Sequence, residues 1–157
     1  MTRWMWGALN ALQAMFMALV TIVGFPVSLL LGLVSGSGAP LRMASWYWAP
    51  LLFAGAGAKV DVEGAERIDW SKPMVLVANH QSMIDIPALF RAVPVPLRFM
   101  LKREIAGVPI IGWYARLMGM VFIDRGNARD AKRKLGDAAD RLRGGATLAA
   151  FPEGTRS

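Results

Sequence analysis

Hydrophobic positions in the first third of the chain form one long uninterrupted run. Residues 15–34, MFMALVTIVGFPVSLLLGLV, contain no charged side chain over 20 positions, which is about the length that a helix needs to cross the hydrocarbon layer of a bilayer. Pro26, with Gly24 shortly before it, would kink or break such a helix. The pattern therefore predicts either one kinked transmembrane helix or a pair of shorter helices that enter one leaflet and return.

Turn-forming and aromatic residues follow this run. The sequence SGSGAP at 35–40 predicts a turn, because glycine, serine and proline are common turn residues. The sequence WYWAP at 46–50 supplies indole and phenol groups, which are typical of the headgroup level of a membrane. These aromatic residues favour a helical pair held at the interface over a helix that crosses the bilayer, and both interpretations remain open.

Charges at the two ends of the hydrophobic run bear on its orientation. Arg3 and Arg42 flank it and the remainder of the chain is basic, so the positive-inside tendency places the following domain on the cytoplasmic side, which in a bacterium is the cytoplasmic face of the inner membrane. A cleavable secretory signal is a third interpretation. Its apolar region is usually only about 7 to 15 residues long, which is shorter than this run.

The hydrophobic pattern changes after Lys59 to short apolar runs that alternate with helical segments. This alternation is typical of an α/β layer fold with a mostly parallel sheet. We therefore expect two parts, membrane-anchoring helices over 1–57 and an α/β domain over 58–157. The clearest helix is expected over 128–143, between a polar cap and two glycines. The expected strands are 59–64, 74–79, 97–102, 120–124 and 147–151.

Composition and charge narrow the class of protein. Apolar residues make up 55% of the 157 residues and charged residues only 18%, and the net charge is +7. Residues 1–90 contain 5 basic and 5 acidic side chains, whereas residues 91–157 contain 13 and 6. A basic domain behind an apolar anchor is typical of binding to an anionic membrane surface or to phosphorylated substrates, and the anchor argues against nucleic acid as a partner. With no cysteine and a single histidine, the chain has few ligands for zinc.

The strand expected over 74–79 is followed by NHQSMID. This places His80 at the carboxyl end of a buried strand, where open α/β sheets bind ligands. If a helix starts after Ser82, Asp85 lies in its first turn and can point back at the imidazole, leaving the other ring nitrogen to accept a proton. The same residues form an S-x-x-D helix cap, so a purely structural role for His80 stays open. Without a cysteine or a G-x-S-x-G elbow, the pair would act by deprotonating a substrate hydroxyl, which then attacks directly.

Two further strand ends carry groups suited to phosphate. Arg125 follows the strand expected over 120–124, and FPEGTRS at 151–157 places polar residues after the last strand. Because parallel strands end at the same edge of a sheet, these groups can gather near one another. A guanidinium matches phosphate oxygens and a glycine lets the backbone approach a ligand, although each arginine could instead form a surface ion pair. The second group consists of Glu153, Gly154, Thr155 and Arg156.

Together these motifs resemble those of the PlsC-type glycerolipid acyltransferases. The resemblance runs from about Val75 to Ser157 and rests on three blocks, NHQSMID, MLKREIAGVPIIGWYARLMGMVFIDR and FPEGTRS. Their order and spacing are highly specific. The form of the third block is most similar to the branch that acylates 1-acylglycerol 3-phosphate to phosphatidate, a step of phospholipid biosynthesis.

The resemblance implies a role for each residue. His80 would be the general base on the sn-2 hydroxyl, and Asp85 would orient it and stabilise its positive form. Arg125 would bind the glycerol phosphate, and the polar residues of the third block would form the other side of that pocket. Lys102 in the middle block would contact the phosphate or the thioester. The resemblance also implies acyl-CoA or acyl carrier protein as the donor, no metal or other cofactor, and an N-terminal two-helix membrane motif.

Members of this family continue past the third block with a fourth, apolar and proline-containing block. Because the chain ends at Ser157, we expect it to be an N-terminal fragment. The alternative functions are acylation of another lysolipid or of glycerol 3-phosphate, and an inactive module that binds anionic lipid.

Overall fold

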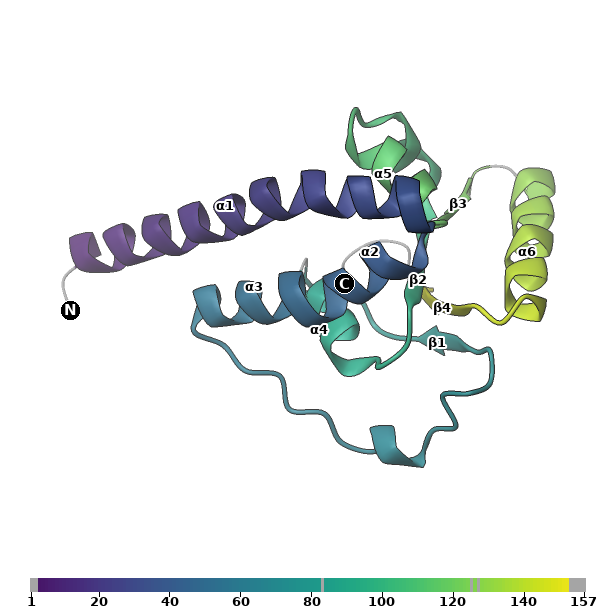
Figure 1. The fold of residues 1–157 in the computed structure, drawn as a ribbon, viewed down its shortest axis with the longest axis horizontal. Helices are drawn as coiled ribbons and strands as arrows, with labels where there is room; N and C mark the ends of the chain where they lie inside the picture. Colours follow the sequence, from purple (N-terminus) through teal and green to yellow (C-terminus); the bar gives the residue numbers. More distant parts are fainter. Residues whose placement is uncertain (1–2, 83, 125, 127, 153–157) are drawn as a thin grey trace.

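Helices cover both faces of a small parallel sheet (Figure 1). The computed structural model describes residues 3–82, 84–124, 126 and 128–152. The α-helices are α1 (Arg3–Ser35), α2 (Gly38–Met43), α3 (Ala49–Ala56), α4 (Asp85–Ala92), α5 (Ile111–Leu117) and α6 (Ala128–Arg143). The strands are β1 (Val75–Val77), β2 (Leu97–Lys102), β3 (Val121–Ile123) and β4 (Thr147–Ala150). A π-helical segment, η1 (Ala44–Trp48), joins α2 to α3, and 3₁₀ turns occupy Ala65–Arg67 and Arg103–Gly107. The expected α/β fold with a parallel sheet behind an apolar N-terminal helical region is confirmed.

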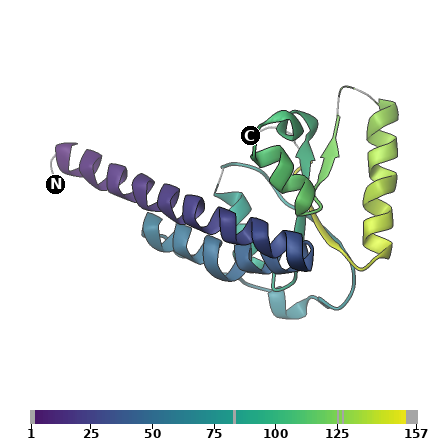
Figure 2. The same cartoon turned by 45° about the horizontal axis from the view of Figure 1, so that its top comes forward.

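The N-terminal region forms a helical hairpin. α1 is one continuous helix of 33 residues with Pro26 in its interior. The chain turns at Gly36, whose φ of +72° suits glycine, and returns along α1 through α2, η1 and α3 (Figure 2). The expected pair of helices divided at Pro26 is therefore wrong, because the two arms meet after Ser35 instead. Proline removes one backbone N–H donor, so one hydrogen bond of the helix is missing at Pro26. α1 nevertheless continues past Pro26, and it packs along the second arm.

Small residues allow the second arm of the hairpin and α5 to approach α1 closely. The buried positions of α1 recur every fourth residue, and they are Val20, Gly24, Ser28 and Gly32. A Cβ on Gly24 would lie 2.9 Å from the Tyr47 ring, and one on Gly32 would lie 2.8 Å from the Leu117 side chain. This spacing of small residues is common where membrane helices pack together.

The aromatic residues at 46–50 belong to the second arm and not to a loop. Trp46 is 70% exposed and faces away from the protein. The indole N–H of Trp48 donates a hydrogen bond to the Thr21 hydroxyl of α1 at 3.1 Å. The two indoles therefore differ in role, because one ties the arms together and the other offers an apolar surface. The turn expected over 35–40 is shorter than predicted, since α2 already begins at Gly38.

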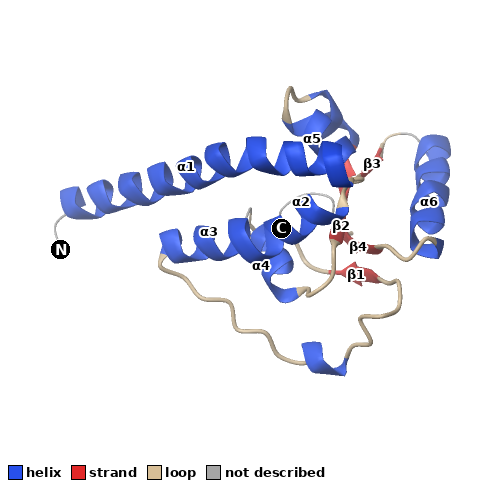
Figure 3. Cartoon of the chain, in the orientation of Figure 1, coloured by secondary structure: helices blue, strands red, loops and turns tan. Residues whose placement is uncertain are grey.

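The four strands form one sheet in the order β1-β4-β2-β3, and each neighbouring pair is parallel (Figure 3). Their carboxyl ends therefore lie at one edge. Strands are present in four of the five expected places, and α6 has the bounds predicted for the helix over 128–143. The strand expected over 59–64 is wrong, because this segment connects α3 to the turn at Ala65–Arg67 without strand structure. Its alternating side chains match a strand, but a strand also needs a neighbouring backbone, and none of the described strands pairs with it.

Apolar side chains from the two central strands fill both faces of the sheet. On the hairpin side, Phe99 of β2 packs in one cluster with Leu41 of α2 and Phe90 of α4. On the other side, Leu148 of β4 packs in a second cluster with Ala138 of α6. Alternate residues of the strands thus face opposite layers, as parallel sheets covered on both faces require. This packing fixes the strand ends on which the site is built.

Candidate active site

The end of β1 brings a histidine and a carboxylate together. The pairing with β4 extends past Val77, because the N–H of Ala78 donates to the carbonyl of Ala150 at 3.2 Å. The chain then leaves the sheet, and α4 begins at Asp85. Across this turn the Nδ1 atom of His80 lies 2.9 Å from Oδ2 of Asp85. The contact that the sequence spacing predicted is therefore present at the carboxyl edge of the sheet.

One oxygen of Asp85 accepts three hydrogen bonds. Besides the imidazole, the backbone N–H groups of Gln81 and Ser82 donate to Oδ2 at 2.7 Å and 2.8 Å. Burial by itself would raise the pKa of Asp85, but the hydrogen bonds from Ser82, His80 and Gln81 outweigh it and hold the pKa below its ordinary value. The carboxylate is therefore ionised at neutral pH, and its negative charge faces the imidazole.

The capping interpretation and the site geometry are compatible. The bond from the Ser82 N–H to the Asp85 carboxylate is one half of a capping box. The other half is replaced, because the N–H of Asp85 donates to the backbone oxygen of Ser82 at 3.1 Å and the Ser82 hydroxyl accepts a long 3.4 Å bond from Ile84. The start of α4 therefore holds the carboxylate that orients His80.

An aromatic residue that sequence reasoning did not assign to the site packs on the imidazole. Phe151, directly after β4, stacks on His80 with ring centroids 4.3 Å apart and planes inclined by 20°. Phe99 follows at 6.1 Å from Phe151, and Phe90 lies 5.2 Å from Phe99. Trp48 of the hairpin, 6.2 Å from Phe90, completes this aromatic column. The only signal in the sequence was an apolar residue before PEGTRS, and such a residue usually belongs to the core.

Of the remaining predicted site residues, the structure describes Lys102 alone. Lys102, the last residue of β2, forms an ion pair with Glu104 at 2.9 Å, and 56% of its side chain is exposed. Its contact with phosphate or thioester stays a prediction. Arg103 donates to Asp124, just after β3, at 2.9 Å, so charged groups from two more strand ends share this edge. The predicted residues Arg125, Glu153, Gly154, Thr155 and Arg156 lie outside the residues that the structure describes.

The pair of His80 and Asp85 supplies acid–base chemistry. With Nδ1 directed at a carboxylate, the imidazole can take a proton at Nε2, and the fixed negative charge stabilises the imidazolium that forms. Within the described part of the chain, no three His, Asp or Glu side chains lie close enough to hold a metal ion.

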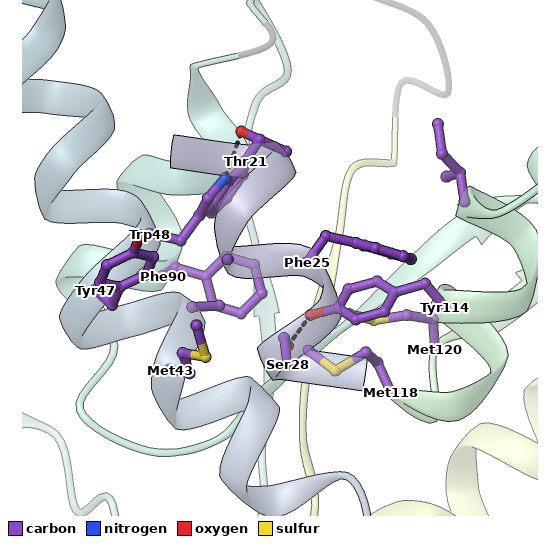
Figure 4. A pocket seen from close by; sticks show the side chains of 13 residues that line it. Thr21, Phe25, Ser28, Met43, Tyr47, Trp48, Phe90, Tyr114, Met118 and Met120 are labelled. Atoms are coloured by element: carbon purple, nitrogen blue, oxygen red, sulfur yellow. Dashed lines mark hydrogen bonds between the residues drawn. The ribbon is translucent and has the colours of Figure 1, made fainter. Parts of the chain in front are cut away.

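An apolar cavity of about 230 Å³ lies between the hairpin, α4 and α5 (Figure 4). The hydroxyls of Ser28 on α1 and Tyr114 on α5 share a hydrogen bond in its wall. His80 and Asp85 do not line the cavity, but Phe90 does, and Phe90 also belongs to the aromatic column. The cavity suits an apolar ligand because its other lining side chains include Phe25, Met43, Trp48, Met118 and Met120.

The parallel sheet carries a His–Asp pair at its carboxyl edge, and an apolar hairpin packs against one of its faces. A His–Asp pair of this kind is suited to activating a hydroxyl group. The model of the Acyltransferase family matches residues 59–157, which is more than half of the chain, and the chain therefore belongs to that family.

Relatives and a solved structure agree with this assignment. A chloroplastic 1-acyl-sn-glycerol-3-phosphate acyltransferase of Arabidopsis thaliana is 33% identical over 151 residues, covering 93% of this chain and 40% of its own. A lyso-ornithine lipid O-acyltransferase of Rhizobium meliloti is 33% identical over 147 residues, covering 94% and 48%. The crystal structure of the 1-acyl-sn-glycerophosphate acyltransferase PlsC from Thermotoga maritima superposes with a TM-score of 0.73 at 29% identity, covering 94% of this chain and 62% of that one. The chain thus spans between 40% and 62% of the length of these three proteins.

Proposed function

We propose that the chain carries the catalytic site of a 1-acylglycerol-3-phosphate O-acyltransferase. It moves a fatty acyl group from acyl-CoA or acyl carrier protein to the sn-2 hydroxyl of lysophosphatidate, giving phosphatidate. The observation that carries the proposal is the 2.9 Å contact between His80 and Asp85 at the carboxyl edge of the sheet. Such a pair can raise the nucleophilicity of an alcohol at neutral pH without a covalent enzyme intermediate.

The mechanism follows from this geometry. His80 takes the proton of the sn-2 hydroxyl at Nε2, and the hydroxyl oxygen attacks the thioester carbonyl carbon. The tetrahedral intermediate then breaks its carbon–sulfur bond, and the departing thiolate receives the proton back from the imidazolium. Asp85 stabilises the positive imidazolium between these two steps, and Phe151 limits rotation of the ring.

Substrate binding is assigned to the neighbouring strand ends. Arg125 binds the glycerol phosphate, and the third block, Glu153 to Arg156, forms the facing wall of that pocket. Lys102 exchanges its ion pair with Glu104 for a phosphate or thioester contact when substrate arrives. The steps use the side chains of the protein alone, with no metal or organic cofactor, and the acyl thioester acts as co-substrate.

The hairpin associates this site with a membrane. α1 is long and apolar enough to cross a bilayer, and only 22% of its most apolar window is buried in the protein. A core helix of a soluble protein would hide most of that surface. Apolar side chains such as Ile22, Leu33 and Val34 instead face outward along α1. The second arm returns alongside α1, which favours insertion into one leaflet, with the α/β domain on the cytoplasmic face.

Acylation of a lyso-ornithine lipid is the second candidate function. It is favoured by the Rhizobium meliloti relative, which matches the plant lysophosphatidate enzyme in identity, 33% each, and covers 94% of this chain against 93%. Both functions require the same activation of a hydroxyl by His80, and they differ in the polar group that the site must bind.

The test is acyl transfer in detergent micelles with acyl-CoA as donor. The wild-type chain and His80→Ala are each given lysophosphatidate or lyso-ornithine lipid, and the released CoA and the lipid product are measured. We expect phosphatidate from the wild type and a loss of at least about 10²-fold in His80→Ala. A wild type active only on lyso-ornithine lipid would support the second function. Activity that survives in His80→Ala would refute the mechanism for both.

A further inference from the structure

Arginines from three elements gather at the edge of the sheet opposite to His80. Arg98 is the second residue of β2, and Arg141 lies near the end of α6. Their Nε and Nη1 atoms stand 3.1 Å and 3.0 Å from the point that a Cβ on Gly119 would occupy. Arg42 of α2 approaches Gly38, with Nη2 3.5 Å from the corresponding point there. Gly38 lines the same cavity as Arg98 and Arg141.

Among the described residues, no carboxylate forms an ion pair with these guanidinium groups. Over residues 3–82, 84–124, 126 and 128–152, neither Arg42, Arg98 nor Arg141 forms an ion pair, whereas the nearby Arg143 pairs with Asp140. Asp137 attracts Arg141 only at a distance. Arginine pairs held this close repel each other, and an anion placed between them removes the repulsion.

An uncancelled positive charge costs more free energy at Arg98 than at a fully exposed arginine, because burial removes water from the guanidinium. Its side chain is half-buried, and burial together with the charge of Arg141 lowers its pKa. Its Nη2 donates to the Ser37 hydroxyl at 2.9 Å, at the turn between α1 and α2. That bond satisfies one donor, but a neutral hydroxyl does not offset the positive charge of the guanidinium. Arg98 therefore links the first strand residues of β2 to Ser37, at the turn where the apolar hairpin meets the sheet.

Arg98 and Arg141 both line an open cavity of about 470 Å³. Besides the two arginines, it is lined by Gly38, Trp70, Val95, Pro96 and residues 144–147. We propose that Arg98 and Arg141, with Arg42 at the rim, bind a phosphate group here, either of an anionic lipid headgroup or of free phosphate. Two guanidinium forks can donate to different oxygens of one phosphate, which is the geometry that arginine offers and lysine does not. This site is separate from the proposed catalytic phosphate pocket, which lies at the carboxyl edge, and does not depend on the proposed function.

The test compares Arg141→Gln with Arg143→Gln. The two changes remove the same charge from the last turn of α6, but only Arg141 lines the cavity. The whole chain, in micelles of neutral detergent, is titrated in one arm with phosphatidylglycerol and in the other with inorganic phosphate at constant ionic strength. The measurement is the ligand concentration at which half of the protein is bound, obtained by fitting the rise in melting temperature against ligand concentration.

We expect Arg141→Gln to raise this midpoint about fivefold in the arm that contains the true ligand, and Arg143→Gln to leave it near the wild-type value. A shift with phosphatidylglycerol alone identifies a lipid headgroup, and a shift with inorganic phosphate identifies a free phosphate. Arg98→Gln should act in the same direction, but it also removes the bond to Ser37, so Arg141→Gln carries the test. Equal midpoints for Arg141→Gln and Arg143→Gln in both arms would overturn the proposal.

Discussion

Replacing Asp85 by asparagine tests how the carboxylate contributes to the proposed reaction. Asparagine keeps an oxygen that can accept the N–H groups of Gln81 and Ser82, so the turn before α4 is retained. The change removes the negative charge whose oxygen lies 2.9 Å from His80 Nδ1. At a separation of about 4 Å between charge centres and an effective dielectric constant of about 20, that charge stabilises an imidazolium by about 4 kcal/mol.

Partial exposure reduces this value. The side chains of His80 and Asp85 are 18% and 24% exposed, so water screens part of the attraction, and we take about half of it as effective. A loss of about 2 kcal/mol in the transition state corresponds to a fall in kcat of about 30-fold. Because the carboxylate acts on the imidazole and not on the lipid, KM for lysophosphatidate should change little.

The assay is initial-rate acyl transfer with thermal unfolding measured on the same samples. Asp137→Asn is the matched control, since Asp137 also forms an ion pair, with Lys134 at 2.8 Å, but lies on α6 away from the site. The control should keep wild-type kcat. An Asp85→Asn variant that retained more than about a third of wild-type kcat, with its fold intact, would show that the charge plays no part in the rate.

Three further predictions follow from the same structure. Phe151→Leu keeps an apolar side chain but removes the stacking on His80, so kcat should fall about tenfold with KM unchanged. A rise in KM would instead place Phe151 against the substrate. Gly112→Ala should lower the free energy of unfolding by about 1–3 kcal/mol in a denaturant titration, because its Cβ would overlap the Ala106 carbonyl oxygen, and an unchanged midpoint would contradict this close packing. Hydrogen bonding holds the pKa of Asp85 below the ordinary value of about 3.9, so the stability that this carboxylate contributes is fully present above that pH and is lost as the pH falls through the folded-state pKa. The difference in melting temperature between wild type and Asp85→Asn should therefore shrink below about pH 4. A difference that stays constant with pH would argue against an ionised Asp85.

Local pattern was sufficient for much of the domain. The strand over 97–102 has the bounds of its apolar run, and the helix over 128–143 has the bounds that its polar cap and the two following glycines predicted. The contact of His80 with Asp85 was also predictable, because the two residues are joined by a short turn whose geometry is restricted by the helix start. For the helix and for this contact, the decisive interactions link residues that are near one another in the sequence.

The same reasoning failed where a distant partner decides the structure. The segment 59–64 has the alternation of a strand, yet no described strand pairs with it. Pro26 predicted a kink or a break, yet α1 continues as one helix, and the second arm of the hairpin comes from 38–56, which begins inside the turn expected over 35–40. Propensity describes what a segment can form alone, and tertiary contacts of a few kcal/mol are enough to override it.

The sequence by itself determined the apolar first third, the α/β pattern of the remainder and the three blocks, the first of which places a histidine and an aspartate at one strand end. Only the tertiary structure placed Phe151 on His80 and brought Arg98 and Arg141 together beside Gly119. These groups lie on different elements, so their separation is set by the order of the strands and by the packing of α6 and the hairpin on the two faces of the sheet. No local period in the chain records that arrangement, because it arises from side chains that meet only when the layers close around a common core.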